Sequence, residues 1–130
     1  MPHIIVEYSQ NLEQRIDVQG LLDALHETAI ASGVFPLGGA RTRAARREAY
    51  TIADGHPDNA YVHVQLRIGH GRDEETKRSA AQALFDTATA YLAQDFARNP
   101  LGISLELVEI DPAYSFKQNN LHEYVKRRSS

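Results

Sequence analysis

The sequence predicts a single α/β domain, a two-layer α+β sandwich in which a four-stranded sheet carries two helices on one face. Strand-like and helix-like segments follow one another in the order strand, helix, strand, and this order occurs twice in halves of about equal length. Each unit requires a right-handed crossover, so its two strands should be parallel with the helix on one side. The length of 130 residues fits one domain over residues 1–130.

The first half begins with a strand over residues 2–9, because PHIIVEYS is rich in β-branched and aromatic residues. After a polar loop, Asp17 is placed to cap a helix, and Gly33 marks the C-terminus of that helix because glycine readily takes positive φ. A weaker extended segment follows over about residues 40–53 and ends in the turn sequence DGHPDN. The helix is predicted from apolar residues at helical spacing: Val18, Leu21, Leu22, Leu25, Ala29 and Ile30.

The second half repeats this order. Residues 61–68 alternate between apolar and polar side chains and predict a strand. A glycine-containing turn then leads into a helix with acids in its first turn, ended by Asn99 and Pro100. A fourth strand is expected over residues 103–110, and the polar tail from Asp111 on is expected to be frayed. This helix is predicted from one apolar stripe at helical spacing: Ala80, Ala81, Leu84, Phe85, Ala88, Tyr91, Leu92 and Phe96.

Charge and composition exclude several classes of function. A net charge of -3 gives no general attraction to nucleic acid or to an anionic membrane, so an anion site must be a local cluster of arginines. The absence of cysteine excludes disulfides and thiolate chemistry. The first residues lack a basic region followed by an apolar stretch, and no apolar run approaches membrane-spanning length. We therefore expect a cytoplasmic protein without nucleic-acid or membrane partners.

Two helices on one side leave the other face of the predicted sheet without cover. A mixed apolar and polar surface of this kind suits burial against other subunits, so we expect an oligomer. The face would carry His3, Ile5, Glu7, Tyr61, His63 and Gln65.

Pro2 is the first candidate for chemistry. The residue after Met1 is small, so Met1 can be removed, which turns Pro2 into a free secondary amine anchored to a strand. Burial and neighbouring cations both disfavour the protonated amine and lower its pKa toward the value that a general base needs near neutral pH. The alternative is a proline that only begins an edge strand, where its missing N–H costs nothing.

Arg41 and Arg72 are the candidates for anion binding. Arg41 follows two glycines at the start of a strand, where the backbone can approach a ligand closely. Arg72 comes just before a helix N-terminus, whose N–H groups and dipole favour an anion. Arginine suits bidentate capture of carboxylates. The other arginines of these segments are expected to be solvated.

The remaining motifs give no support for a metal or a cofactor. The six histidines show no HExxH or other ligand spacing. The phosphate-binding patterns GxGxxG and GxxxxGK[ST] are missing, and no serine or cysteine nucleophile motif occurs.

Four blocks of the sequence, MPHIIVEYS, SGVFPLGGARTR, YVHVQLRIGHGR and YSFKQNNLHEY, closely resemble the 5-carboxymethyl-2-hydroxymuconate Δ-isomerases of bacterial homoprotocatechuate (4-hydroxyphenylacetate) degradation. The resemblance runs in register from Met1 to about Lys126. This family belongs to the tautomerase superfamily, whose members look like β-α-β duplications assembled as trimers. The resemblance therefore implies a homotrimer, and it implies the same architecture that the segment order predicts.

The resemblance also implies roles for three residues. Pro2 matches the catalytic proline, and Arg41 and Arg72 match the substrate-binding arginines, with no metal or cofactor required. The implied substrate is a conjugated dienol with three carboxylates. The neutral Pro2 amine takes the proton of the 2-hydroxyl, and a proton is returned at C5 to leave a 2-oxo-3-ene. An arginine beside the 2-oxo group would polarise it.

Two other functions stay open from the sequence. Another reaction of the superfamily, such as 4-oxalocrotonate or phenylpyruvate tautomerisation, would use the same Pro2 with different anion contacts. A non-enzymatic trimeric binding module is the other class, and retention of Met1 would favour it.

Overall fold

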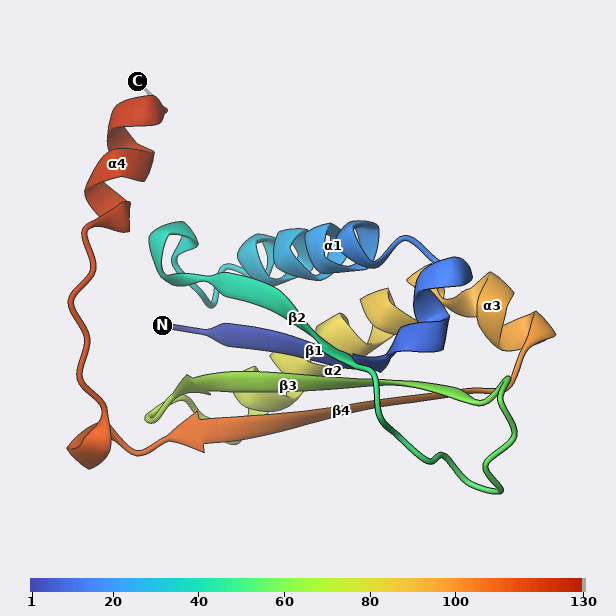
Figure 1. Cartoon of the computed structure of the whole chain (residues 1–130). Coiled ribbons are helices and arrows are strands. Elements are labelled where there is room, and N and C mark those ends of the chain that lie inside the picture. Colours follow the sequence, from blue (N-terminus) through green and yellow to red (C-terminus); the bar gives the residue numbers. More distant parts are fainter. Residues whose placement is uncertain (130) are drawn as a thin grey trace.

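The computed structural model describes residues 1–129 and consists of a sheet covered by helices on one face (Figure 1). The sheet contains β1 (His3–Ser9), β2 (Arg41–Arg47), β3 (Ala60–Gly69) and β4 (Leu101–Ile110) in the order β2-β1-β3-β4. The long helices α1 (Val18–Ala31) and α2 (Glu74–Tyr91) pack side by side behind it. The predicted two-layer sandwich of two β-α-β units is confirmed.

The strand pairing places the start of the chain inside the sheet. β1 pairs with β2 and β3 pairs with β4 in parallel, whereas β1 and β3 meet antiparallel in the middle. β1 is therefore hydrogen-bonded on both sides, with His3 opposite Arg41 in β2 and opposite Arg67 in β3. The edge-strand interpretation of Pro2 is wrong, because the strand that follows Pro2 is an inner one.

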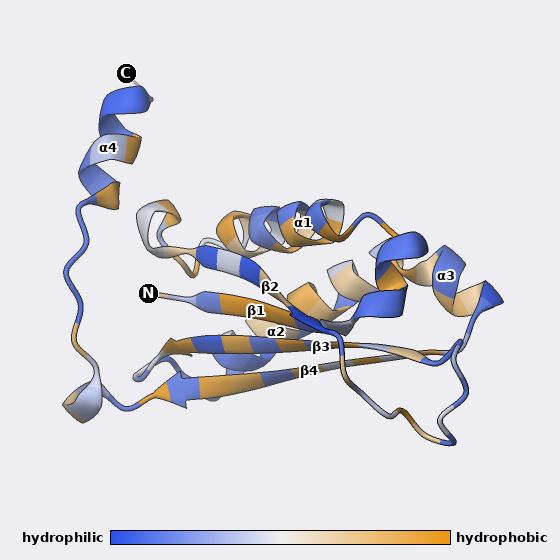
Figure 2. Ribbon diagram, viewed as in Figure 1, coloured by the Kyte–Doolittle hydropathy of each residue, from blue (hydrophilic) through white to orange (hydrophobic). Residues whose placement is uncertain are grey.

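The core lies between the sheet and the two helices. Alternate residues of β1 and β3 point into it, and Figure 2 shows the alternating hydropathy along β3. α1 and α2 contribute the apolar stripes that their spacing predicts. The other sheet face keeps partly buried side chains such as Ile5 and His63 and has no helix over it. The largest fully buried apolar side chains are Ile4, Leu12, Leu21, Leu25, Leu66, Ile68, Leu84 and Leu92.

Several predicted element boundaries are wrong. β2 covers Arg41–Arg47 rather than residues 40–53, because β1, the strand that it pairs with, ends at Ser9 opposite Arg47. β4 begins at Leu101, two residues before the predicted start. Asp17 does precede α1, but its side chain makes no capping hydrogen bond. Gly33 has a φ of 73° after the end of α1, as predicted.

The second helical stripe is divided between two helices. α2 ends at Tyr91 and α3 (Ala93–Arg98) follows, although Leu92 keeps a hydrogen bond from its N–H to the carbonyl of Ala88. Phe96, predicted to be in the stripe, is 60% exposed. α3 instead directs Asp95 inward, where that carboxylate meets a cation.

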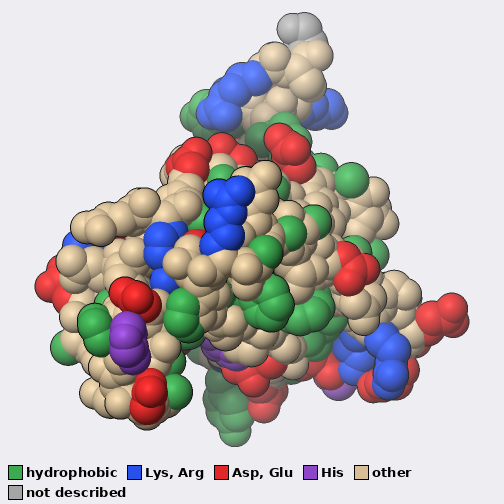
Figure 3. Space-filling view, turned by 90° about the vertical axis from the view of Figure 1, so that its right-hand side faces the viewer, with side chains coloured by type: hydrophobic (Ala, Val, Ile, Leu, Met, Phe, Trp, Pro, Cys, Tyr) green, Lys and Arg blue, Asp and Glu red, His purple; other side chains and the backbone are tan. Residues whose placement is uncertain are grey.

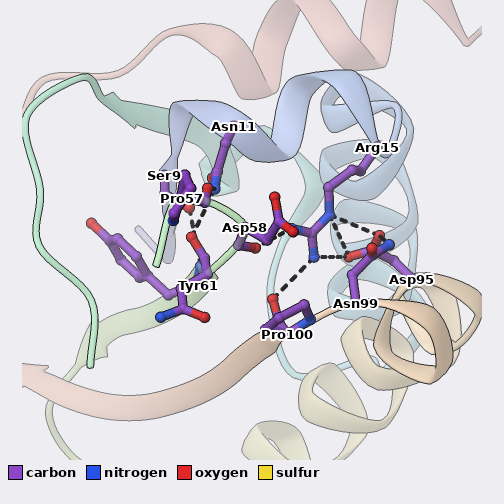
Figure 4. A network of polar contacts seen from close by, with 10 residues as sticks. Ser9, Asn11, Arg15, Pro57, Asp58, Tyr61, Asp95, Asn99 and Pro100 are labelled. Atoms are coloured by element: carbon purple, nitrogen blue, oxygen red, sulfur yellow. Dashed lines mark hydrogen bonds and ion pairs between the residues drawn. The ribbon is translucent and has the colours of Figure 1, made fainter. Parts of the chain in front are cut away.

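This cation is Arg15, at the end of the sheet remote from the N-terminus (Figure 4). Arg15 lies just after a short 3-10 helix, η1 (Gln10–Gln14), and its Nε and Nη2 donate to the buried carboxylate of Asp95 at 2.9 and 2.6 Å. Its Nη1 donates to the carbonyl of Asp58 and its Nη2 to that of Pro100. One guanidinium thus joins α3, the loop before β3 and the start of β4. Figure 3 shows the surrounding surface, where acidic and basic side chains are interspersed.

The C-terminal segment forms an ordered arm rather than a frayed tail. The 3-10 helix η3 (Pro112–Tyr114) follows β4, and after an extended link the helix α4 (Leu121–Arg128) begins. The arm runs past the end of the sheet that holds the N-terminus (Figure 1). α4 contacts η2 (Leu37–Gly39), the 3-10 turn just before β2, which fastens the arm to the first half of the chain.

Candidate active site

The candidate site is built around the beginning of β1. Pro2 is buried, and its carbonyl accepts a hydrogen bond from the backbone N–H of Arg41 at 3.0 Å. This bond is the first of the β1–β2 pairing, so the same contact fixes the N-terminus and the start of the arginine strand. Met1 precedes Pro2 in the structure and carries the terminal amine.

Arg41 is held beside this terminus by the glycine turn that precedes it. Its Nη1 donates to the carbonyl of Gly39 at 2.7 Å, and the side chain is half-buried. Gly39 also lies against the proline ring, because a Cβ added to Gly39 would sit 3.6 Å from Cδ of Pro2. The glycine turn therefore places Arg41 close to Pro2.

Arg72 reaches the same region from the loop before α2. Its guanidinium lies 5.1 Å from the ring centroid of the buried Phe35, and Nη2 donates to the carbonyl of Val34 at 3.3 Å. The prediction that the N–H groups at the N-terminus of α2 favour an anion beside Arg72 needs correction. The carboxylate of Asp73 already accepts the N–H of Thr76 and caps α2, so the helix N-terminus is occupied by the protein's own acid. Arg72 must act through its own charge.

A cavity of about 690 Å³ opens beside the N-terminus. Met1, His3 and Arg41 line one side of it, and the arm lines another with Phe116 and Lys117. Lys117 was not singled out from the sequence, although it lies in the FKQNN block that carries the family resemblance. A lysine in a polar tail has no periodicity or spacing that marks it as a site residue, and only the folded arm brings it to the cavity.

The electrostatic environment of the terminus favours a neutral amine. Burial lowers the pKa of the N-terminal amine below its ordinary value, and the positive charges of Lys117, Arg72 and Arg41 lower it further. The pKa of His3 is also lowered, first by burial and then by the charge of Arg43. The site therefore concentrates positive charge around a group that can act as a base.

The other arginines of β2 have different partners. Nε of Arg46 donates to the carboxylate of Glu13 at 2.6 Å, and Nε of Arg47 donates to Glu7 at 2.7 Å. Arg43 is exposed and contacts the ring of His3. In contrast, the hydrogen bonds of Arg41 and Arg72 within residues 1–129 go to backbone carbonyls. Neither guanidinium is paired with a carboxylate among these residues, so both are available to an anionic ligand.

Across residues 1–129 there is no group of three or more His, Cys, Asp or Glu side chains arranged to hold a metal ion. Among the helices in the same range, none is long and apolar enough to cross a membrane.

The duplicated β-α-β sheet has counterparts among solved structures. A fused 4-OT, solved as a symmetric trimer, superimposes with a TM-score of 0.61 at 21% identity, and the match covers 88% of this chain and 94% of that one. At this identity the match shows the fold alone, a duplicated β-α-β sheet.

The particular family follows from closer matches. The model of the 5-carboxymethyl-2-hydroxymuconate isomerase family matches residues 2–125. The 5-carboxymethyl-2-hydroxymuconate Delta-isomerase of Escherichia coli is 39% identical over 126 residues, 97% of this chain and the whole of that protein. The crystal structure of a 5-carboxymethyl-2-hydroxymuconate isomerase from Deinococcus radiodurans R1 matches at 39% identity with a TM-score of 0.88, over 95% of this chain and 93% of that one. The chain belongs to the 5-carboxymethyl-2-hydroxymuconate isomerase family, which confirms the resemblance.

Proposed function

We propose that this protein isomerises 5-carboxymethyl-2-hydroxymuconate in homoprotocatechuate degradation, with the amine of Pro2 as the base after removal of Met1. The observation that carries the proposal is a terminal amine at a cavity of about 690 Å³ that Arg41 and Lys117 line, with Arg72 close enough to lower the pKa of this amine. A substrate with three carboxylates brings negative charge to a place where the protein supplies only cations. The relatives' names support the same substrate.

The proposed reaction begins with substrate binding. Arg41 and Arg72 pair with carboxylates of the substrate, each by charge-assisted hydrogen bonds. Their backbone partners hold the two guanidinium groups in place before the substrate arrives, so little ordering is needed on binding. The neutral amine of Pro2 then faces the 2-hydroxyl group.

Proton transfer completes the isomerisation. The lone pair of the Pro2 nitrogen takes the hydroxyl proton, and the electron pair moves through the diene as C2 becomes a carbonyl. A proton is delivered to C5, the C2–C3 double bond becomes single, and the remaining double bond lies between C3 and C4. An arginine near the 2-oxo group stabilises the negative charge that develops on this oxygen. Pro2 loses its proton again before the next turnover.

The cations also tune the base. A positive charge close to the amine disfavours its protonated form, so substrate binding and activation of Pro2 depend on the same side chains. Pro2 lies one residue further into the fold than the amine of Met1 and is itself buried, so the same two effects act on it.

Direct assay tests the proposal. The purified protein, with Pro2 confirmed as the first residue by intact mass, is mixed with 5-carboxymethyl-2-hydroxymuconate, and loss of the conjugated dienol absorbance is followed. The enol forms of 4-oxalocrotonate and phenylpyruvate serve as comparison substrates, each followed by the loss of its enol absorbance. We expect the highest kcat/KM for the tricarboxylate, and a clear preference for either comparison substrate would contradict the proposal.

We further propose that the working form is a homotrimer. The support is the helix-free face of the sheet, where Ile5, Tyr61 and their neighbours on β1 and β3 remain partly exposed in the single chain. Burial of such a face against other copies removes apolar surface from water. Light scattering at micromolar concentration should give three times the chain mass, and a stable monomer would refute this assembly.

A further inference from the structure

Lys117 occupies a distinctive place in the arm. It lies in the extended link between η3 and α4, and residues of this link line the cavity. Its side chain is exposed in the single chain and lines the cavity together with Arg41. The position depends on the arm alone, because neither β-α-β unit contains it.

The arm is fastened next to Lys117. Nδ2 of Asn119 donates to the carbonyl of Gly38 at 3.0 Å, which ties the link to the turn that also positions Arg41. Oδ1 of Asn119 accepts the N–H of Leu121 at 2.9 Å and so connects the link to the start of α4. Gly38 permits this approach, because a Cβ there would lie 2.9 Å from the Cα of His122. The end of the link next to α4 is therefore held two residues after Lys117, which keeps Lys117 at the cavity.

Lys117 has no carboxylate partner within the described part of the chain. Lys77 illustrates the alternative, because its Nζ lies 3.0 Å from Glu109 and 3.2 Å from Glu74. The cavity is also lined by Arg41, and Arg72, which donates to the carbonyl of the lining residue Gly69, lies close by, so an ammonium group here raises the local repulsion. Such an arrangement is stabilised when an anion binds between the cations.

We infer that Lys117 binds the carboxymethyl carboxylate of the substrate and thereby selects a tricarboxylate over dicarboxylates. The inference rests on the proposed function. Arg41 and Arg72 are planar groups fixed by backbone carbonyls, which suits the carboxylates of a flat conjugated chain. The carboxylate of the carboxymethyl group is attached through a CH₂ that rotates freely, and the flexible side chain of a lysine can adjust to its position. Three cations then meet three carboxylates.

The test compares two substrates that differ by this one group. Lys117→Gln is assayed with 5-carboxymethyl-2-hydroxymuconate and with 2-hydroxymuconate, which lacks the carboxymethyl arm. We expect kcat/KM for the tricarboxylate to fall about 10- to 100-fold, mostly through KM, because the contact lies away from the reacting atoms. The value for the dicarboxylate should change less than about threefold, since one charge-assisted contact is not used there. Lys117→Arg should restore most of the preference, and Lys126→Gln on α4 is the matched control for a lost charge.

The outcomes separate the inference from the proposed function. An unchanged tricarboxylate preference in Lys117→Gln, or an equal loss on both substrates, would overturn the inference while wild-type activity upholds the function. If the wild-type protein is inactive on both substrates, the proposed function fails. The role of Lys117 is then tested by calorimetry, which measures the affinity for tricarballylate and for glutarate, a compound that lacks the middle carboxylate. Loss of tricarballylate preference in Lys117→Gln supports the inference, and equal affinities in wild type and variant overturn it.

Discussion

Blocking the N-terminus is the most direct perturbation of the proposed mechanism. When any residue precedes Pro2, its nitrogen is part of a peptide bond and has neither a proton nor a basic lone pair. Because the carbonyl of Pro2, rather than its nitrogen, bonds to Arg41, the sheet forms equally well with an extension. The variant should therefore fold like the processed protein and differ only in its chemistry.

The expected loss of activity is large. General base catalysis contributes about 10²–10⁴-fold, which corresponds to roughly 3–5.5 kcal/mol of transition-state free energy. Met1 also lines the cavity, so an extension takes space that the substrate needs. We therefore expect a loss near the upper end, about 10⁴-fold in kcat/KM. Pro2→Ala, which keeps a terminal amine in the same place, should lose less, about 10- to 10³-fold.

The assay compares two forms of the same chain. One carries an uncleaved N-terminal tag, and the other carries the tag after α4, whose end projects from the body of the molecule (Figure 1). Intact mass defines each terminus, circular dichroism checks the fold, and dienol loss measures the rate. Full activity in a protein whose mass shows the N-terminal tag still attached would refute Pro2 as the base.

Three further predictions concern binding, pH and stability. Arg41→Ala and Arg72→Ala should each lower kcat/KM about 10- to 100-fold in steady-state kinetics, because a charge-assisted contact is lost. Arg46→Ala is the control and should have little effect. Equal losses in all three variants would contradict the assignment of Arg41 and Arg72 to substrate binding. Burial and cations lower the pKa of the terminal amine of Met1. The same effects on a terminal Pro2, whose protonated amine is inactive on the proposed mechanism, predict that kcat/KM rises with pH through a limb below about 8 and that Arg72→Ala moves this limb upward. A limb that stays in place would argue against the electrostatic tuning. Asp95→Asn should reduce the free energy of unfolding by about 1.5–3 kcal/mol in urea titrations near neutral pH, because a buried carboxylate loses its charge-assisted bonds. The pKa of this carboxylate is lowered by its arginine partner, so the difference between wild type and variant should vanish as acid protonates it; a constant difference would exclude the ion pair as the cause.

The parts of the fold that follow from periodicity were predictable. The alternation in β3 and the apolar stripe of α1 each define a buried face, and two such units determine the layers. Gly33 marks the end of α1 because a positive φ there favours glycine. The end of β2 was not predictable in the same way, because it depends on where its partner β1 stops.

The arm is the main feature that the sequence did not reveal. α4 buries no residue fully, so its sequence has no apolar stripe from which the helix could be predicted. The position of the arm also depends on contacts with a turn about 80 residues earlier. Pro2, Arg41 and Arg72 were predicted as a group, partly through local glycines and largely through resemblance. Lys117 was missed for the same reason as the arm that carries it.

The inner position of β1 also has a consequence for the order of events during synthesis. β1 is made first, but its neighbours on both sides are β2 and β3, so it cannot be enclosed until residue 69 has left the ribosome. In the finished fold Pro2 is buried and Met1 is half-buried, so the Met1–Pro2 bond is poorly placed for an aminopeptidase. While the terminus is still free on the nascent chain, the same bond is open to attack. On the proposed mechanism, maturation of the catalyst therefore competes in time with folding, and a chain that folds before it is trimmed becomes a stable but inactive subunit.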